Sequence, residues 1–126
     1  MAYSFEMRVH DTYLYAKLSG QETAAEDLQV AQALLEICQG FGKWRLVADL
    51  RELAGRLSIA DNSYVAREMA ALWHGKISCI ATVSRSENYQ TERFFAMALS
   101  NRGVSAESFT DLASAENWIK TRAAHI

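Results

Sequence analysis

The alternation of hydrophobic and polar residues predicts a strand at the start of the chain. From Ser4 to His10 every second residue is hydrophobic, which is the period of a strand with one buried face. The same alternation runs from Tyr13 to Leu18, after a break at Asp11 and Thr12. Two such runs separated by a short polar break predict an antiparallel hairpin.

A helix is predicted directly after the hairpin. Ser19 and Gly20 end the second strand. Thr23, followed three residues later by Glu26, forms a capping box, and the helical pattern then runs to about Gln39.

Two largely hydrophobic segments predict strands that are covered on both faces. They span residues 44–49, where Leu46, Val47 and Ala48 form an uninterrupted hydrophobic block, and residues 77–83. Between them we expect a loop from Leu50 to Leu57 and a helix from Ile59 to Trp73, which ends before a glycine.

The rest of the chain continues the alternation of helices and strands. Ser84 with Glu87 predicts the cap of a third helix, which Gly103 ends before a short strand over residues 104–109. A last helix begins near Leu112. The order is ββαβαβαβα, so we expect an α/β fold with a mostly parallel five-stranded sheet, an N-terminal antiparallel hairpin, and one domain over residues 1–126.

Composition narrows the class of protein. The chain has 126 residues, 50% of them hydrophobic, and a net charge of −2 with both signs interspersed, which favours neither nucleic acid nor an anionic membrane as a partner. No hydrophobic run approaches the ~20 residues that span a bilayer, and the first residues lack a secretory pattern. We therefore expect a cytoplasmic protein without stable membrane insertion. Cys38 and Cys79 fall within hydrophobic patterns and are predicted to be buried free thiols.

The polar residues do not predict an enzyme or a metal centre. His10, His74 and His125 lack the spacing of metal ligands, and no serine lies in a nucleophile elbow. Asp49 ends a buried strand as the phospho-acceptor of a receiver domain does, but the acidic cluster and late lysine of a receiver are missing. We expect Asp49 to hydrogen-bond the following turn, and we expect no cofactor.

Three segments together resemble the SpoIIAA-like branch of the STAS superfamily, known from anti-sigma-factor antagonists. They are YLYAKLSGQETAAEDL, WRLVADLRELAGRLSIAD and NRGVSAESFTDLASAENWI. The resemblance implies a small mixed sheet with helices packed against it, and a function through protein contacts or through a ligand groove near the helix starts. The matching positions are Gly20, Asp49, Leu50, Phe109, Asp111, Ala115 and Trp118.

The resemblance also points to Ser58 as a possible phosphorylation site. In anti-sigma-factor antagonists, a serine within Asp-Ser-Ser-Gly begins the helix after the strand that ends in Asp-Leu, and Ser58 is the corresponding residue. Leu57, Ile59 and Ala60 replace the other three residues of that motif. The alternative is that Ser58 only caps the helix, with Asp61 completing an S-x-x-D box.

Three arginines are predicted on loops at the edge of the sheet where α/β folds place ligands. Arg51, Arg56 and Arg85 could form an anion-binding rim, or they could be solvated side chains balanced by Glu52 and Glu87.

The helix over residues 59–73 has a wide hydrophobic stripe, which either contacts a partner or ligand or is absorbed by the core. Our first hypothesis is a non-catalytic regulatory module that binds a protein partner or a second copy of itself. The alternative is a carrier or sensor of a small apolar, lipid-like or anionic ligand. The candidate surface comprises Arg51, Arg56, Ser58, Asp61, Tyr64, Met69, Ser84 and Arg85.

Overall fold

The computed structural model describes residues 3–55 and 57–122. The strands are β1 (Ser4–Val9), β2 (Leu14–Gln21), β3 (Arg45–Ala54), β4 (Cys79–Val83) and β5 (Ser105–Phe109). The helices are α1 (Ala24–Gly40), α2 (Ile59–Trp73), α3 (Tyr89–Ser100) and α4 (Leu112–Thr121), with a 3₁₀ turn at Ser86–Asn88 before α3.

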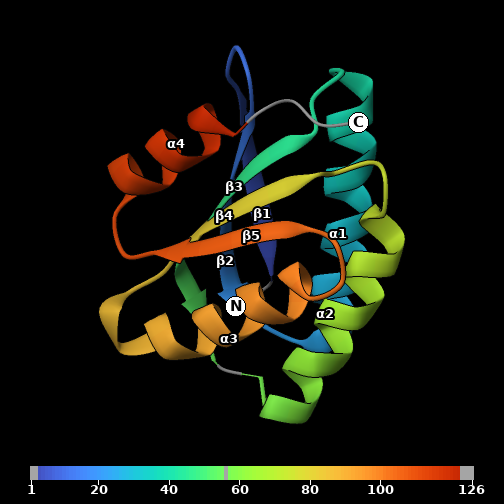
Figure 1. The fold of residues 1–126 in the computed structure, drawn as a ribbon. Coiled ribbons are helices and arrows are strands. Elements are labelled where there is room, and N and C mark those ends of the chain that lie inside the picture. The colour runs from blue at the N-terminus through green and yellow to red at the C-terminus, as the bar shows by residue number, and fades with distance from the viewer. Residues whose placement is uncertain (1–2, 56, 123–126) are drawn as a thin grey trace.

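The five strands form one sheet in the order β1-β2-β3-β4-β5 (Figure 1). β1 and β2 are antiparallel, and every other neighbouring pair is parallel. The predicted element order, the hairpin and the parallel crossovers are therefore confirmed.

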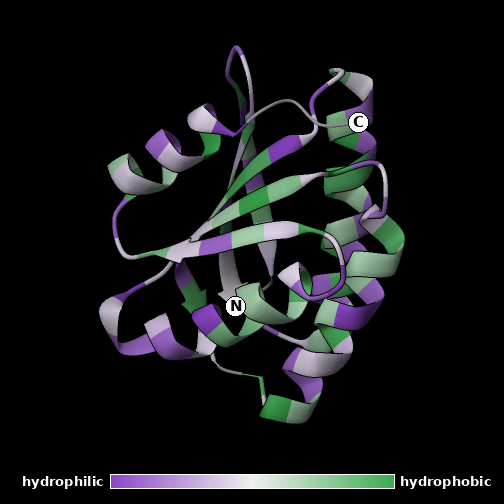
Figure 2. Cartoon of the chain, viewed as in Figure 1, coloured by the Kyte–Doolittle hydropathy of each residue, from purple (hydrophilic) through white to green (hydrophobic). Residues whose placement is uncertain are grey.

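Helices cover the two faces of the sheet unequally. α1, α2 and α3 pack on one face, whereas α4 packs alone on the other (Figure 1). Strongly hydrophobic segments lie in the central strands between these layers (Figure 2). The predicted burial of both cysteines is confirmed, since Cys38 belongs to the three-helix side of the core, Cys79 belongs to the α4 side, and both are free.

The predicted loop from Leu50 to Leu57 was wrong, because β3 continues to Ala54. The predicted end of β2 at Gly20 was also wrong, because Gly20 and the residue after it pair with the last residues of β3. The pairing slips by one residue between Lys17 and Ser19, so that Lys17 lies opposite Asp49 but Ser19 lies opposite Glu52. The sequence pattern did not show this part of the strand because Arg51 and Glu52 are exposed while Leu53 is buried.

The predicted cap of the third helix at Ser84 was also wrong. The backbone N–H of Ser84 donates to the carbonyl of Phe109 at 2.9 Å, so Ser84 extends the pairing of β4 with β5. The chain then makes a 3₁₀ turn, and α3 starts only at Tyr89.

Candidate functional site

Ser58 caps the N-terminus of α2, as the sequence predicts. Its side-chain oxygen accepts a hydrogen bond from the backbone N–H of Asp61 at 3.0 Å. Both side chains are exposed, so the first turn of the helix is open to a binding partner.

A large hydrophobic residue lies on the surface beside this cap. Ile59 is 75% exposed, the highest value among the exposed large hydrophobic residues of the described chain. Tyr64, five residues further along α2, is 43% exposed, and the guanidinium of Arg67 lies 5.4 Å from the centre of its ring. The start of α2 therefore presents hydrophobic groups next to polar ones. We call Ser58, Ile59, Asp61 and Tyr64 the α2 surface.

The α3 helix, which packs beside α2, carries two further exposed hydrophobic side chains. Phe94 and Met97 lie three residues apart on α3 and are 41% and 53% exposed. They line a shallow hollow with Asn101 and Arg102. The outer side of the three-helix layer thus has exposed hydrophobic groups on two helices.

Two residues of the predicted partner surface lie in the interior instead. Met69 is 8% exposed and packs in the core with Val65 and Trp73, so the wide stripe of α2 is largely absorbed by the sheet and by α1. The indole N–H of Trp73 donates to the carbonyl of Ala31 in α1 at 3.1 Å. Ser84 is 1% exposed, because it continues strand β4. Placing Met69 and Ser84 on an accessible surface was therefore wrong.

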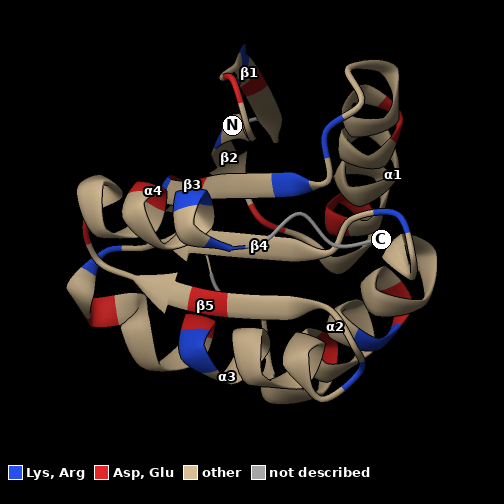
Figure 3. Ribbon diagram, turned by 45° about the horizontal axis from the view of Figure 1, so that its top comes forward, with Lys and Arg blue, Asp and Glu red and all other residues tan. Residues whose placement is uncertain are grey.

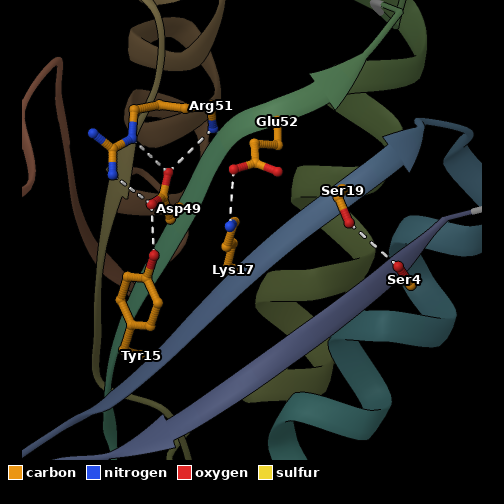
Figure 4. A network of polar contacts seen from close by, with 7 residues as sticks. All are labelled: Ser4, Tyr15, Lys17, Ser19, Asp49, Arg51 and Glu52. Carbon is orange, nitrogen blue, oxygen red and sulfur yellow. Dashed lines mark hydrogen bonds and ion pairs between the residues drawn. The ribbon is translucent and has the colours of Figure 1, made fainter.

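Arg51 does not lie on a loop as predicted but on β3, where it binds Asp49. Its Nε donates to Oδ1 of Asp49 at 2.9 Å and its Nη2 donates to Oδ2 at 2.7 Å (Figure 4). The hydroxyl of Tyr15, on β2, donates to the same carboxylate at 2.6 Å. Residue Asp49 is 2% exposed, whereas the Arg51 side chain is 41% exposed.

These contacts keep the carboxyl group of Asp49 ionised. Burial alone disfavours the carboxylate of Asp49, but hydrogen bonds from Arg51 and Tyr15 outweigh burial and hold the pKa of Asp49 below its ordinary value. Burial and the bond to Asp49 together raise the pKa of Tyr15 to about 12. The network is thus an ionised carboxylate held by two donors, and its arginine is already paired.

Arg85 is also paired with its neighbours. Arg85 lies 3.6 Å from the carboxylate of Glu87 and also donates to the carbonyl of Leu53 at 3.4 Å. Arg56 lies outside the described residues, as does His125. Arg51 and Arg85 therefore fit the interpretation as side chains balanced by neighbouring carboxylates, although the partner of Arg51 is Asp49 rather than Glu52.

The sheet face next to this network carries further polar pairs. Lys17 and Glu52 are 2.9 Å apart across β2 and β3, and the hydroxyls of Ser4 and Ser19 are 3.3 Å apart across β1 and β2 (Figure 4). Basic and acidic residues alternate over the fold without a large area of one sign in this view (Figure 3).

A small cavity lies between the sheet and the three-helix layer. Its volume is about 50 Å³. Hydrophobic side chains line most of it, together with the carboxyl groups of Asp27 and Glu92 and the amide of Asn62, all buried. The hydroxyl of Tyr3 donates to Asp27 at 2.5 Å, and burial raises the pKa of Asp27. This space suits a few water molecules.

Two of these features could not be predicted from the sequence. The partners of Asp49 come from β2 and from two residues further along β3, and a pairing between strands cannot be read from either segment alone. In the sequence, Ile59 stands out only because it replaces the second serine of the Asp-Ser-Ser-Gly motif. Its exposure depends on how the first turn of α2 is placed relative to the sheet, which the local sequence does not show.

The described residues contain no group of three or more histidine, cysteine or acidic side chains placed to hold a metal ion. Within the same part of the chain, each helix is too short or too polar to cross a membrane.

Comparison of the sequence with models of protein families and with curated proteins finds no match. Comparison of the fold finds similar solved structures. An anti-sigma factor antagonist from Mycobacterium paratuberculosis has a TM-score of 0.63 at 16% identity, over 94% of this chain and 95% of that one. An uncharacterized DUF3478-family protein with a SpoIIAA-like fold, from Shewanella loihica PV-4, has a TM-score of 0.58 at 20% identity, over 94% and 92% of the two chains. With its antiparallel hairpin, parallel crossovers and unequally covered sheet, this chain has a SpoIIAA-like fold.

Proposed function

We propose that this protein is a non-catalytic regulatory module that binds a protein partner through the α2 surface. One of its structural neighbours is an anti-sigma factor antagonist, a class named for acting against another protein. A fold supports many functions, so the properties of the site decide between them.

The observation that carries the proposal is the exposure of Ile59. A single exposed isoleucine is ordinary, but this one is 75% exposed, adjoins the uncovered N-terminus of a helix, and is followed by a half-exposed tyrosine. Protein interfaces combine an anchoring aromatic or aliphatic side chain with polar groups around it. Ile59 and Tyr64 would supply the hydrophobic contacts, and Ser58 and Asp61 the polar rim.

We propose that phosphorylation of Ser58 regulates this surface. A phosphate would lie at a helix N-terminus, where backbone N–H groups and the helix dipole favour negative charge. The carboxylate of Asp61, in the same first turn, opposes that charge. A phosphate would therefore add repulsion and place a charge beside Ile59, and we expect it to weaken rather than strengthen binding at this surface.

The proposal of a small-molecule carrier is weaker, because the cavity in the interior is small. Pockets for drug-sized ligands measure roughly 300–1,000 Å³. The cavity beneath the three helices measures about 50 Å³, so a ligand of that size would have to displace a helix or core side chains.

The test is a comparison of proteins recovered from a lysate of the source organism. The bait is the wild-type chain, the Ile59→Asp variant, or the Phe41→Asp variant. Phe41 is the matched control, since it is also a hydrophobic residue exposed by 56%, but lies at the C-terminal end of α1. Circular dichroism first establishes that both variants are folded.

The proposal expects a protein that wild type and Phe41→Asp retain and Ile59→Asp loses. Identification of that protein by mass spectrometry then allows titration with purified components. If wild type and Ile59→Asp recover the same proteins, the α2 surface is not the docking site.

A further inference from the structure

Strand β1 forms one edge of the sheet. It is the first strand in the sheet order, so its only strand partner within the described chain is β2 (Figure 3). The outward N–H and C=O groups of an edge strand can pair with another strand.

The hairpin fixes which residues direct their backbone groups outward. The N–H of His10 donates to the carbonyl of Tyr13 at 3.0 Å, which makes these two residues a hydrogen-bonded pair. Hydrogen-bonded and non-hydrogen-bonded pairs alternate along an antiparallel ladder. In the register of β1 with β2, the N–H and C=O groups of Phe5, Met7 and Val9 therefore point away from β2.

Only one antiparallel register pairs all three of these outward residues. Pairing through the outward groups requires Phe5, Met7 and Val9 to lie opposite residues of this same set. Placing Met7 opposite itself sets Glu6 against Arg8 of the second copy, twice by symmetry. A slip of the second copy by two residues sets Glu6 against Glu6 in one direction and Arg8 against Arg8 in the other, and like charges directly opposite are destabilising.

We propose that β1 pairs antiparallel with β1 of a second copy, with Met7 on the two-fold axis and Glu6 opposite Arg8 of that copy. The two sheets then become one continuous sheet. This interface is separate from the α2 surface, so it stands whether or not the proposed function holds.

The hydrophobic residues of β1 fit the same register. Val9 is 48% exposed, and Phe5 and Met7 are half-buried. In the proposed pair Val9 lies opposite Phe5 of the second copy, so the most exposed hydrophobic residue of the strand gains an aromatic neighbour. The charged side chains of Glu6 and Arg8 lie on the other face, where their pairing favours this register over registers shifted by two residues.

Sedimentation equilibrium over a wide range of protein concentrations tests the proposal. Wild type is expected to dimerise reversibly. Met7→Pro removes an outward N–H without removing a bond to β2, and is expected to weaken dimerisation by about tenfold or more, since two symmetric hydrogen bonds are lost. Wild type that stays monomeric throughout would overturn the proposal.

Charge exchange tests the register. Glu6→Lys alone sets lysine against Arg8, and Arg8→Glu alone sets glutamate against Glu6, so each variant is expected to dimerise less than wild type. Mixed together, the two variants restore both opposite-charge pairs and are expected to form a heterodimer. Glu107→Lys, on the other edge strand β5, is the control and should dimerise as wild type does. Failure of the mixture to associate, or loss of the dimer in Glu107→Lys, would contradict the assigned edge.

A disulfide gives a direct geometric test. Met7→Cys places two thiols on residues whose Cα atoms are about 5.5 Å apart in a hydrogen-bonded pair, within the ~4.4–6.8 Å that a disulfide spans. Val9→Cys is the control, since the two copies of residue 9 would be about 14 Å apart. The native thiols Cys38 and Cys79 are buried. Under mild oxidation only Met7→Cys should yield a covalent dimer, and equal cross-linking of both variants would refute the register.

Discussion

The guanidinium of Arg51 donates hydrogen bonds to both carboxylate oxygens of Asp49, two residues earlier on the same strand, at 2.9 and 2.7 Å. This is possible because a strand places residues i and i+2 on one face. The sequence offers Arg51 as a ligand-binding residue, but in the structure Arg51 stabilises a buried carboxylate.

Arg51→Met is expected to destabilise the fold by about 1–3 kcal/mol, because it leaves the buried carboxylate of Asp49 without its charged donor while keeping much of the hydrocarbon stem. Urea unfolding measures the change. Lys17→Met is the matched control: its partner Glu52 is exposed, so little change is expected there. Equal effects of the two substitutions would mean that burial of Asp49 does not matter to the pair.

Asp27→Asn is expected to change how stability depends on pH. Burial raises the folded-state pKa of Asp27, so the folded protein binds a proton more tightly than the unfolded chain does. The resulting stabilisation is complete below the unfolded pKa, about 3.9, and is lost as pH rises through the raised folded value. Asparagine cannot ionise, so stability measured by urea unfolding at a series of pH values should fall less over this window. Glu36→Gln, at an exposed site of the same helix, is the control. Parallel profiles for wild type and Asp27→Asn would contradict the assignment.

A charge at Met69 should destabilise the fold far more than a charge at Tyr64. Met69→Glu buries a carboxylate in the core and is expected to unfold the chain or to cost several kcal/mol, on the order of 3 or more. Tyr64→Glu, at a 43% exposed site, should change stability by about 1 kcal/mol or less. Thermal unfolding followed by circular dichroism distinguishes them. A folded Met69→Glu variant of normal stability would show that Met69 is not a core residue.

Ser58→Ala is expected to lower stability by about 1 kcal/mol through loss of the bond to the N–H of Asp61. Ser58→Asp should keep most of that stability, because aspartate also caps helices. Urea unfolding of both variants makes the comparison. If alanine and aspartate behave alike and like wild type, the cap contributes nothing measurable.

Much of the fold follows from local patterns. Alternation predicts β1 and β2, largely hydrophobic segments predict β3 and β4, and the Thr23 and Ser58 caps mark two helix starts correctly. The errors lie where tertiary contacts override the local signal. β3 continues through charged residues because Arg51 pairs with Asp49 and Glu52 pairs with Lys17. α3 starts late because the backbone N–H of Ser84 is hydrogen-bonded to β5.

The candidate site was less accessible to sequence reasoning. The polar cap at Ser58 has a local signature, so its geometry could be predicted. The exposure of Ile59 and the burial of Met69 depend on which side of α2 meets the sheet, and the helical stripe contains both kinds of residue. Only packing separates them.

The start of α2 is the proposed docking surface for another protein. Site-specific photo-cross-linking in cells of the source organism tests this docking most directly, with a benzophenone amino acid at position 59 and, as a control, at position 41. We expect a discrete covalent adduct with another protein from position 59 that is missing from position 41. No adduct from position 59, or the same adducts from both positions, would contradict it.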